Sequence, residues 1–180
     1  MAWEVEIKAH VESLDAIKGL LVSRFGKGEA FDKRDAYYEA SDKPGRTRFR
    51  LRSEGNPETG VEVDLVTLKN KGLRDGVEIN EEIEFAISSP AAFDTFALAL
   101  GYRLALEKRK QGWVWEVKSG LHVELADVSG LGGFIEIEAL VDHQANIPEA
   151  EILVKALLES LGIAKTAIEP RYYTELLRSL

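Results

Sequence analysis

Three stretches of the sequence place two glutamates two residues apart with one apolar residue between them: Glu4-Val5-Glu6, Glu82-Ile83-Glu84 and Glu136-Ile137-Glu138. In a β-strand, residues two apart point to the same face, so each stretch would present a pair of carboxylates together. Carboxylate oxygens are hard ligands that suit Mg²⁺ or Mn²⁺. The pairs therefore predict a divalent-cation site, and the plainer alternative is that ordinary strands turn a charged face to water.

A fourth stretch alternates arginine in the same way. Residues 46–52 read Arg-Thr-Arg-Phe-Arg-Leu-Arg, which stacks four guanidinium groups on one strand face. Like charges at neighbouring sheet positions repel, so something anionic must offset them. Lysines at Lys8, Lys69, Lys108 and Lys110 extend this basic set. A polyphosphate together with a divalent cation would satisfy both signs of charge, since Arg and Lys side chains bind phosphate oxygens well.

The elements that must position these groups are mostly strands. Period-two alternation predicts strands at Trp3–Val11, Thr47–Arg52, Glu78–Ile87, Leu121–Ala126 and Phe134–Val141, with weaker patterns at Val61–Lys69 and Leu104–Glu116. Capping residues and helical spacing predict helices over Ser13–Gly26, Ser89–Gly101 and Pro148–Leu161 and a short one after Pro170. The joints at Glu54–Gly60, Asn70–Gly76 and Gly130–Gly133 suit hairpins. We therefore expect an antiparallel α+β sheet of about eight strands, either open or closed into a barrel.

In one predicted strand, residues expected to line the charged face fall on the same face as apolar residues. In Val61–Lys69, Thr67 and Lys69 share a face with the apolar Val63 and Leu65. A β-bulge, which shifts the alternation by one residue, would resolve the conflict.

Composition narrows the class of protein. The chain has 180 residues, of which 45% are hydrophobic and 30% are charged, and this predicts one domain over residues 1–180. The absence of cysteine excludes thiolate catalysis and iron–sulfur clusters. The net charge of −8, with no basic tail, argues against nucleic acid as a partner. No apolar run approaches the length of a membrane span and no signal-like segment begins the chain, so we expect a cytoplasmic protein that does not bind membranes.

The order of the motifs resembles the CYTH superfamily, the triphosphate tunnel metalloenzymes. Glu4–Lys8 is similar to the ExExK signature, and the other family landmarks follow in order at Asp35–Tyr37, Phe49–Arg52, Thr67–Lys69, Glu82–Glu84, Glu107–Lys110, Val128–Glu138 and Glu169–Leu177. The glycine-rich segment before Glu136 and the Glu-Pro-Arg-Tyr-Tyr ending look most like the class IV adenylyl cyclase branch. The likeness covers nearly the whole chain.

The resemblance implies a fold, a metal and roles for particular residues. The fold is an eight-stranded antiparallel closed barrel, the triphosphate tunnel, with helices packed outside. The metal, Mg²⁺ or Mn²⁺, is expected at Glu4, Glu6 and Glu136, with Glu138 as a neighbour. Glu82 and Glu84 are expected either to hold metal or to orient the basic side chains. The triphosphate is expected at Lys8, Arg50, Arg52, Lys69, Lys108 and Lys110. The catalytic residues are expected to be Lys8, Arg52, Glu124 and Lys110. Relatives in this branch further imply a homodimer.

The sequence departs from the family pattern at two positions. Ala126 stands where the family usually has an aspartate, and Asp127 points to the opposite strand face. Glu124 shares the face of Ala126, so we expect it to take over that role from two residues away. Asn80 stands where many relatives carry an arginine.

Three functions are compatible with these residues. The first is an adenylyl cyclase that converts ATP to cyclic AMP and pyrophosphate. The second is hydrolysis of inorganic, thiamine or nucleoside triphosphate, in which water replaces the ribose hydroxyl. The third is a non-catalytic sensor that binds polyphosphate or nucleotide, a reading that the missing carboxylate at Ala126 supports.

Overall fold

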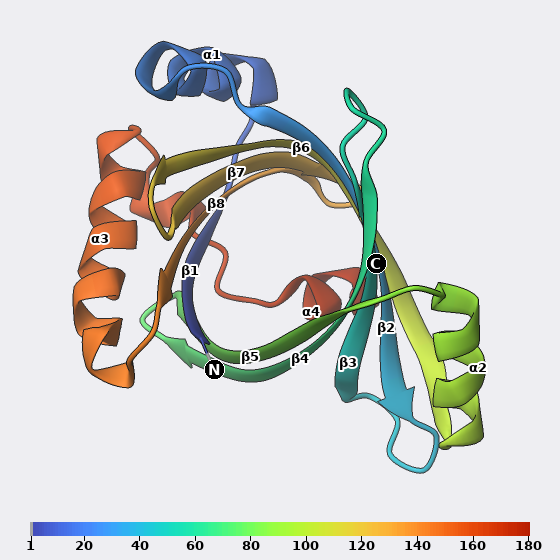
Figure 1. The fold of residues 1–180 in the computed structure, drawn as a ribbon. Coiled ribbons are helices and arrows are strands. Elements are labelled where there is room, and N and C mark those ends of the chain that lie inside the picture. The colour runs from blue at the N-terminus through green and yellow to red at the C-terminus, as the bar shows by residue number, and fades with distance from the viewer. Residues whose placement is uncertain (1) are drawn as a thin grey trace.

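The computed structural model describes residues 2–180, in which eight strands close into a barrel (Figure 1). The strands are β1 (Ala2–His10), β2 (Glu29–Ala40), β3 (Thr47–Gly55), β4 (Glu62–Arg74), β5 (Val77–Ile87), β6 (Tyr102–Lys118), β7 (Leu121–Val128) and β8 (Gly132–Val141). Their order around the barrel is β1-β5-β4-β3-β2-β6-β7-β8, and all neighbours pair antiparallel. The predicted α+β closed barrel is confirmed.

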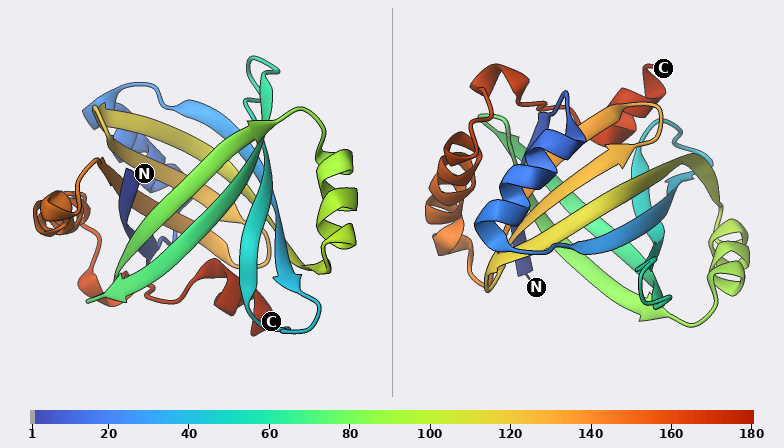
Figure 2. Two further views of the ribbon diagram at one scale, coloured as in Figure 1. Left: turned by 60° about the horizontal axis from the view of Figure 1, so that its bottom comes forward. Right: turned by 90° about the horizontal axis from the view of Figure 1, so that it is seen from above.

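Three helices pack against the outside of the barrel and a fourth lies across one end (Figures 1 and 2). They are α1 (Leu14–Phe25), α2 (Pro90–Ala99), α3 (Ile147–Ser160) and α4 (Tyr173–Arg178), with short 3-10 turns η1 (Gln144–Asn146) and η2 (Lys165–Ala167). The serines predicted as caps begin α1 and α2: Ser13 and Ser89 each accept a hydrogen bond from a backbone amide three residues later. In residues 2–180, no helix has the length and apolarity to span a membrane.

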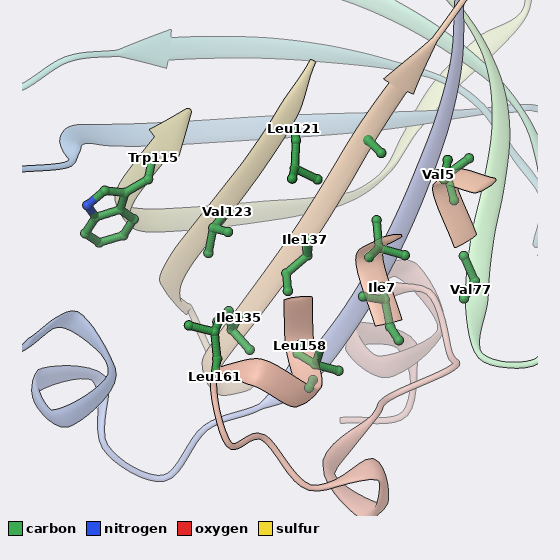
Figure 3. Packing of buried hydrophobic residues seen from close by; sticks show 14 of the residues in the cluster. Val5, Ile7, Val77, Trp115, Leu121, Val123, Ile135, Ile137, Leu158 and Leu161 are labelled. Atoms are coloured by element: carbon green, nitrogen blue, oxygen red, sulfur yellow. The ribbon is translucent and has the colours of Figure 1, made fainter. Parts of the chain in front are cut away.

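The apolar core lies between the barrel wall and the outer helices, not inside the barrel (Figure 3). Val5 and Ile7 of β1 point outward and are buried, in the same cluster as Ile137 of β8 and Val154 and Leu158 of α3. Burying such a side chain stabilises the fold by about 1.5–3 kcal/mol. In β1, β7 and β8 this alternation uses one strand face for the core and leaves the opposite face to line the lumen with its charged residues, whereas Ile83 and Phe85 on the outer face of β5 stay exposed.

Strand β2 was not recognised from periodicity. The register between β2 and β6 shifts between Tyr37 and Tyr38, and both tyrosines are buried. This irregularity breaks the period-two pattern on which the prediction rests. Charged residues also stand on both faces of β2, since Lys33 is buried while neighbouring Arg34 is exposed.

Strand β4 also differs from the prediction. Its register with β3 and β5 continues without a shift, so no bulge separates the two sets of residues, and Val63 lies, 40% exposed, on the face of Thr67. The strand extends to Arg74 and turns at Asp75-Gly76, where both residues have positive φ. Pairing with β3 begins only at Arg50 and Thr67, and beyond this point the two strands diverge (Figure 2).

Candidate functional site: a charged tunnel

The inner faces of the strands surround a cavity of about 1570 Å³. All predicted site residues except Lys8 line it: Glu4, Glu6, Arg50, Arg52, Lys69, Glu82, Glu84, Lys108, Lys110, Glu124, Glu136 and Glu138. Lys8 lies within the wall, 1% exposed, with its Nζ 2.7 Å from Glu78 Oε1. The barrel thus gathers at one place charged groups that are far apart in the sequence.

Three carboxylates form a cluster that fits a metal ion. Oxygens of Glu4, Glu6 and Glu138 all lie within 4.8 Å of one another, and Glu6 pairs directly with Glu138 across β1 and β8. In residues 2–180, neither Glu6 nor Glu138 forms an ion pair with a basic side chain, so their charges lack a partner. Burial, with the nearby charge of Glu4, raises the pKa of Glu138 to about 8. A divalent cation would supply the missing positive charge.

The third member of the cluster, Glu4, is held by a lysine. Lys69 Nζ lies 2.6 Å and 2.8 Å from the two carboxylate oxygens of Glu4. Burial alone would raise the pKa of Glu4, but the Lys69 ammonium outweighs it and lowers the pKa. A cation bound to Glu4 would therefore release Lys69, whose ammonium could then turn to an anion.

Glu136 was expected to join Glu4 and Glu6, but it makes other contacts. Its carboxylate accepts hydrogen bonds from Lys110 and from the hydroxyl of Tyr173 on α4. Lys110 also pairs with Glu124, which points into the tunnel and binds Lys33 as well. Burial would raise the pKa of Glu124, but Lys110 and Lys33 lower it well below its usual range, so this carboxylate is ionised at neutral pH.

Carboxylates of the protein itself neutralise part of the positive charge of the β3 arginines. Arg52 donates from Nε and Nη2 to the two oxygens of Asp35, at 2.7 Å and 3.0 Å, and Lys108 Nζ lies 3.0 Å from the same carboxylate. The Asp35 side chain is fully buried, and burial is outweighed by Arg52 and Lys108, so its pKa is lowered well below the usual range. In contrast, Arg46 and Arg48 form no ion pair in residues 2–180 and remain exposed.

Glu84 contacts a hydroxyl and a basic group, whereas Glu82 contacts Lys69 and also Glu4 of the carboxylate cluster. Glu84 accepts a hydrogen bond of 2.7 Å from Thr67 Oγ1, which itself accepts one from Arg50. Glu82 lies 3.5 Å from Lys69, and burial together with a hydrogen bond to Glu4 raises its pKa to about 7. Glu84 thus contacts Arg50 through Thr67, and Glu82 contacts Lys69 directly.

Sequence reasoning missed Lys33 and Tyr173. Lys33 shares a strand face with Asp35, but β2 itself was not recognised from alternation. Tyr173 closes one end of the tunnel from α4, and its ring lies 5.1 Å from Lys8 Nζ and 4.6 Å from Lys108 Nζ. The Glu-Pro-Arg-Tyr-Tyr motif was noted as a landmark, but nothing local in it says that the second tyrosine points into the lumen.

The CYTH domain family model matches residues 2–173. The chain belongs to the CYTH family. This family is generally metal-dependent and binds triphosphate substrates. A comparison with curated protein sequences found no match.

Solved structures of other proteins share the fold. A protein of Pyrococcus horikoshii OT3, PH1819, is 28% identical with a TM-score of 0.86, and the match covers 98% of each chain. A candidate adenylate cyclase of Vibrio parahaemolyticus is 19% identical with a TM-score of 0.75, again over 98% of each chain. A candidate adenylyl cyclase of Hippeastrum, with a dominant triphosphatase activity, is 15% identical with a TM-score of 0.63 over 99% of this chain and 96% of that one. At these last two identities the likeness concerns the fold.

Proposed function

We propose that this CYTH protein is a metal-dependent adenylyl cyclase that converts ATP to cyclic AMP and pyrophosphate inside the tunnel. One observation supports this most directly: three carboxylates, two of them without a cationic partner, lie in the same cavity as buried and half-buried lysines and half-buried arginines. In a metal–triphosphate complex, the metal would complement the carboxylates of this lining and the phosphates would complement its lysines and arginines. The description of the Vibrio relative as a candidate adenylate cyclase agrees with the proposal.

In the reaction, the ribose 3′-oxygen forms a bond to the α-phosphorus, and the bond from that phosphorus to the pyrophosphate oxygen breaks. The bound metal would act as a Lewis acid and lower the cost of charge on the phosphate oxygens. Lys69, Arg50 and Arg52 would hold the pyrophosphate oxygens, Arg52 through the N–H groups that do not bind Asp35. Lys108, which lines the cavity, and the buried Lys8 would reinforce the positive field.

We assign Glu124 as the general base, the group that accepts the proton of the 3′-hydroxyl. It is ionised at neutral pH because Lys110 and Lys33 hold it. If Lys110 turns to a phosphate oxygen, the carboxylate loses one of these cations and its pKa rises toward the range of an effective general base. The strand that carries Glu124 has no carboxylate at Ala126, which is buried beside Gly112.

Triphosphate hydrolysis is the second candidate, because the same groups would act with water in place of the hydroxyl. The dominant triphosphatase activity described for the Hippeastrum relative favours this alternative. A protein that binds triphosphate without converting it is the third.

Product analysis separates the three candidates. The purified protein is incubated with Mg²⁺ or Mn²⁺ and either ATP or tripolyphosphate, and the products are resolved by chromatography. Formation of cyclic AMP and pyrophosphate would support the cyclase. Release of inorganic phosphate from either substrate would overturn the cyclase and support the triphosphatase. We expect Glu6→Gln to abolish the activity, and Glu124→Ala to reduce it by about 10²–10⁴-fold, as expected for loss of a general base.

Two further outcomes of this assay are informative. Retention of full activity by Glu124→Ala would remove the base assignment, and partial rescue of that variant by Ala126→Asp would strengthen it. No product, with thermal protection by tripolyphosphate, would indicate the binding-only protein. The predicted homodimer stays a prediction that light scattering of the purified protein can test.

A further inference from the structure

A buried amide lies beside the carboxylate cluster with one atom unpaired. Asn80 of β5 is 0% exposed, and in residues 2–180 its Oδ1 accepts no hydrogen bond. A buried carbonyl oxygen without a partner destabilises the folded protein. Such an atom in a native site calls for a partner outside the protein chain, either a water molecule or an ion.

The place of Asn80 in the barrel favours an ion. Asn80 pairs directly with Glu4 across β1 and β5, and the next inward pair on these strands is Glu6 with Glu78. Asn80 Nδ2 lies 3.5 Å from both Glu4 Oε1 and Glu78 Oε2, the outer limit of a hydrogen bond. The amide is therefore close to the cluster of Glu4, Glu6 and Glu138, but Nδ2 is the atom that faces the carboxylates. These long contacts hold the amide only weakly, and a turn of about 180° would present Oδ1 to the cluster instead.

The chemistry of the amide suits a divalent cation. Asparagine carbonyl oxygens are ordinary ligands of hard cations, alongside carboxylates and water. The amide is neutral, so it can add a ligand without adding to the repulsion among the carboxylates of Glu4, Glu6, Glu78 and Glu138.

We propose that Asn80 Oδ1 is a direct ligand of the divalent cation bound by Glu4, Glu6 and Glu138. This inference rests on the metal site of the proposed function. It assigns to Asn80 a role in metal affinity that does not depend on which reaction the tunnel catalyses.

The test is binding of Mn²⁺ to the purified full-length protein without nucleotide, measured by calorimetry and by the loss of the free-ion electron paramagnetic resonance signal. Asn80→Leu keeps the approximate volume and removes the oxygen, and we expect it to weaken Mn²⁺ binding about tenfold or more. Asn80→Asp keeps the oxygen ligand, and we expect binding as tight as, or tighter than, that of the natural protein. Asn70→Leu, on the outer face of the adjacent strand, is the matched control and should bind Mn²⁺ normally.

Each other outcome counts against the inference. Unchanged Mn²⁺ affinity in Asn80→Leu would show that the oxygen meets only water. Equal loss in Asn80→Leu and Asn80→Asp would show that the amide N–H groups, not Oδ1, support the site. If Asn80→Leu does not fold, Asn80→Ala replaces it, and Asn80→Asp alone still distinguishes oxygen from nitrogen.

The same measurement separates this inference from the proposed function. If the natural protein binds Mn²⁺ and Glu6→Gln loses it, the metal site stands whatever Asn80 does. If the natural protein binds no Mn²⁺, both the metal site and the role of Asn80 are overturned.

Discussion

The lysines of the tunnel are held by carboxylates that a phosphate would have to replace. Lys69 binds Glu4, and Lys110 binds both Glu124 and Glu136. A metal ion at Glu4 would weaken its pair with Lys69 and free the ammonium for a phosphate oxygen. Because each ligand makes room for the other, metal and triphosphate should bind with positive coupling, and this coupling must be reciprocal.

Replacement of Arg52 tests the phosphate-binding role at the residue scale. We expect Arg52→Ala to weaken tripolyphosphate binding by about 2–4 kcal/mol, the scale of losing one partner of a buried charge pair. The variant should also lose thermal stability, because buried Asp35 loses its two-donor partner. Calorimetry and thermal unfolding measure the two effects.

Arg48→Ala is the control for this prediction, since Arg48 lines the cavity but forms no ion pair in residues 2–180. It should reduce affinity with little effect on stability. If Arg52→Ala binds tripolyphosphate with an unchanged dissociation constant but unfolds at a lower temperature, Arg52 is a structural residue and not a phosphate-binding one.

At the scale of elements, α4 depends on contacts outside itself. It has six residues, too few for a stable isolated helix. Tyr173 at its start binds Glu136 in the lumen, and Arg178 at its end binds Glu39 and the carbonyl oxygen of Gly45. These contacts hold the helix across one end of the tunnel.

Replacement of Arg178 tests this attachment. We expect Arg178→Ala to increase amide hydrogen exchange across residues 174–179, while the free energy of unfolding falls by less than about 1 kcal/mol because the ion pair is partly exposed. Hydrogen exchange with mass spectrometry measures the first effect and denaturant unfolding the second. Lys165→Ala, an exposed change in the preceding η2 turn, is the control. Unaltered exchange in α4 would show that Arg178 does not hold the helix and that Tyr173 and Leu176 suffice.

At the scale of the whole molecule, the barrel buries acidic groups that are costly to ionise. Burial and neighbouring carboxylates raise the pKa of Glu138 to about 8 and that of Glu82 to about 7, from an ordinary value of 4.5. The folded protein therefore keeps protons that the unfolded chain releases above pH 4.5. Asp35 and Glu124 have lowered pKa values and are already ionised in this range, so they do not compensate.

The metal-free protein should accordingly lose stability as pH rises from about 5 through 8. Mg²⁺ or Mn²⁺ should restore most of this loss at pH 8, because it binds the ionised carboxylates of the folded state only. Thermal unfolding between pH 5 and 9, with and without the metal, measures both effects. A metal-free stability that stays flat between pH 6 and 8.5 would contradict the prediction.

Local sequence determined which residues face the lumen. Alternation in β1, β5 and β8 put the glutamates on one face and valine or isoleucine on the other, and serine caps marked where α1 and α2 begin. These features depend on backbone geometry and on neighbours within a few residues, so they can be read without the fold. Alternation suits an open sheet and a closed barrel equally well. Only the resemblance to the CYTH superfamily therefore indicated that the barrel closes.

Tertiary structure alone decided which of these groups meet. The register between β1 and β8 joins Glu138, and not Glu136, to Glu4 and Glu6, and the register between β1 and β5 brings Asn80 beside them. Local alternation cannot distinguish Glu136 from Glu138, because both share one face of one strand. Their difference comes from pairing between segments at opposite ends of the chain and from the curvature that turns those strands toward each other.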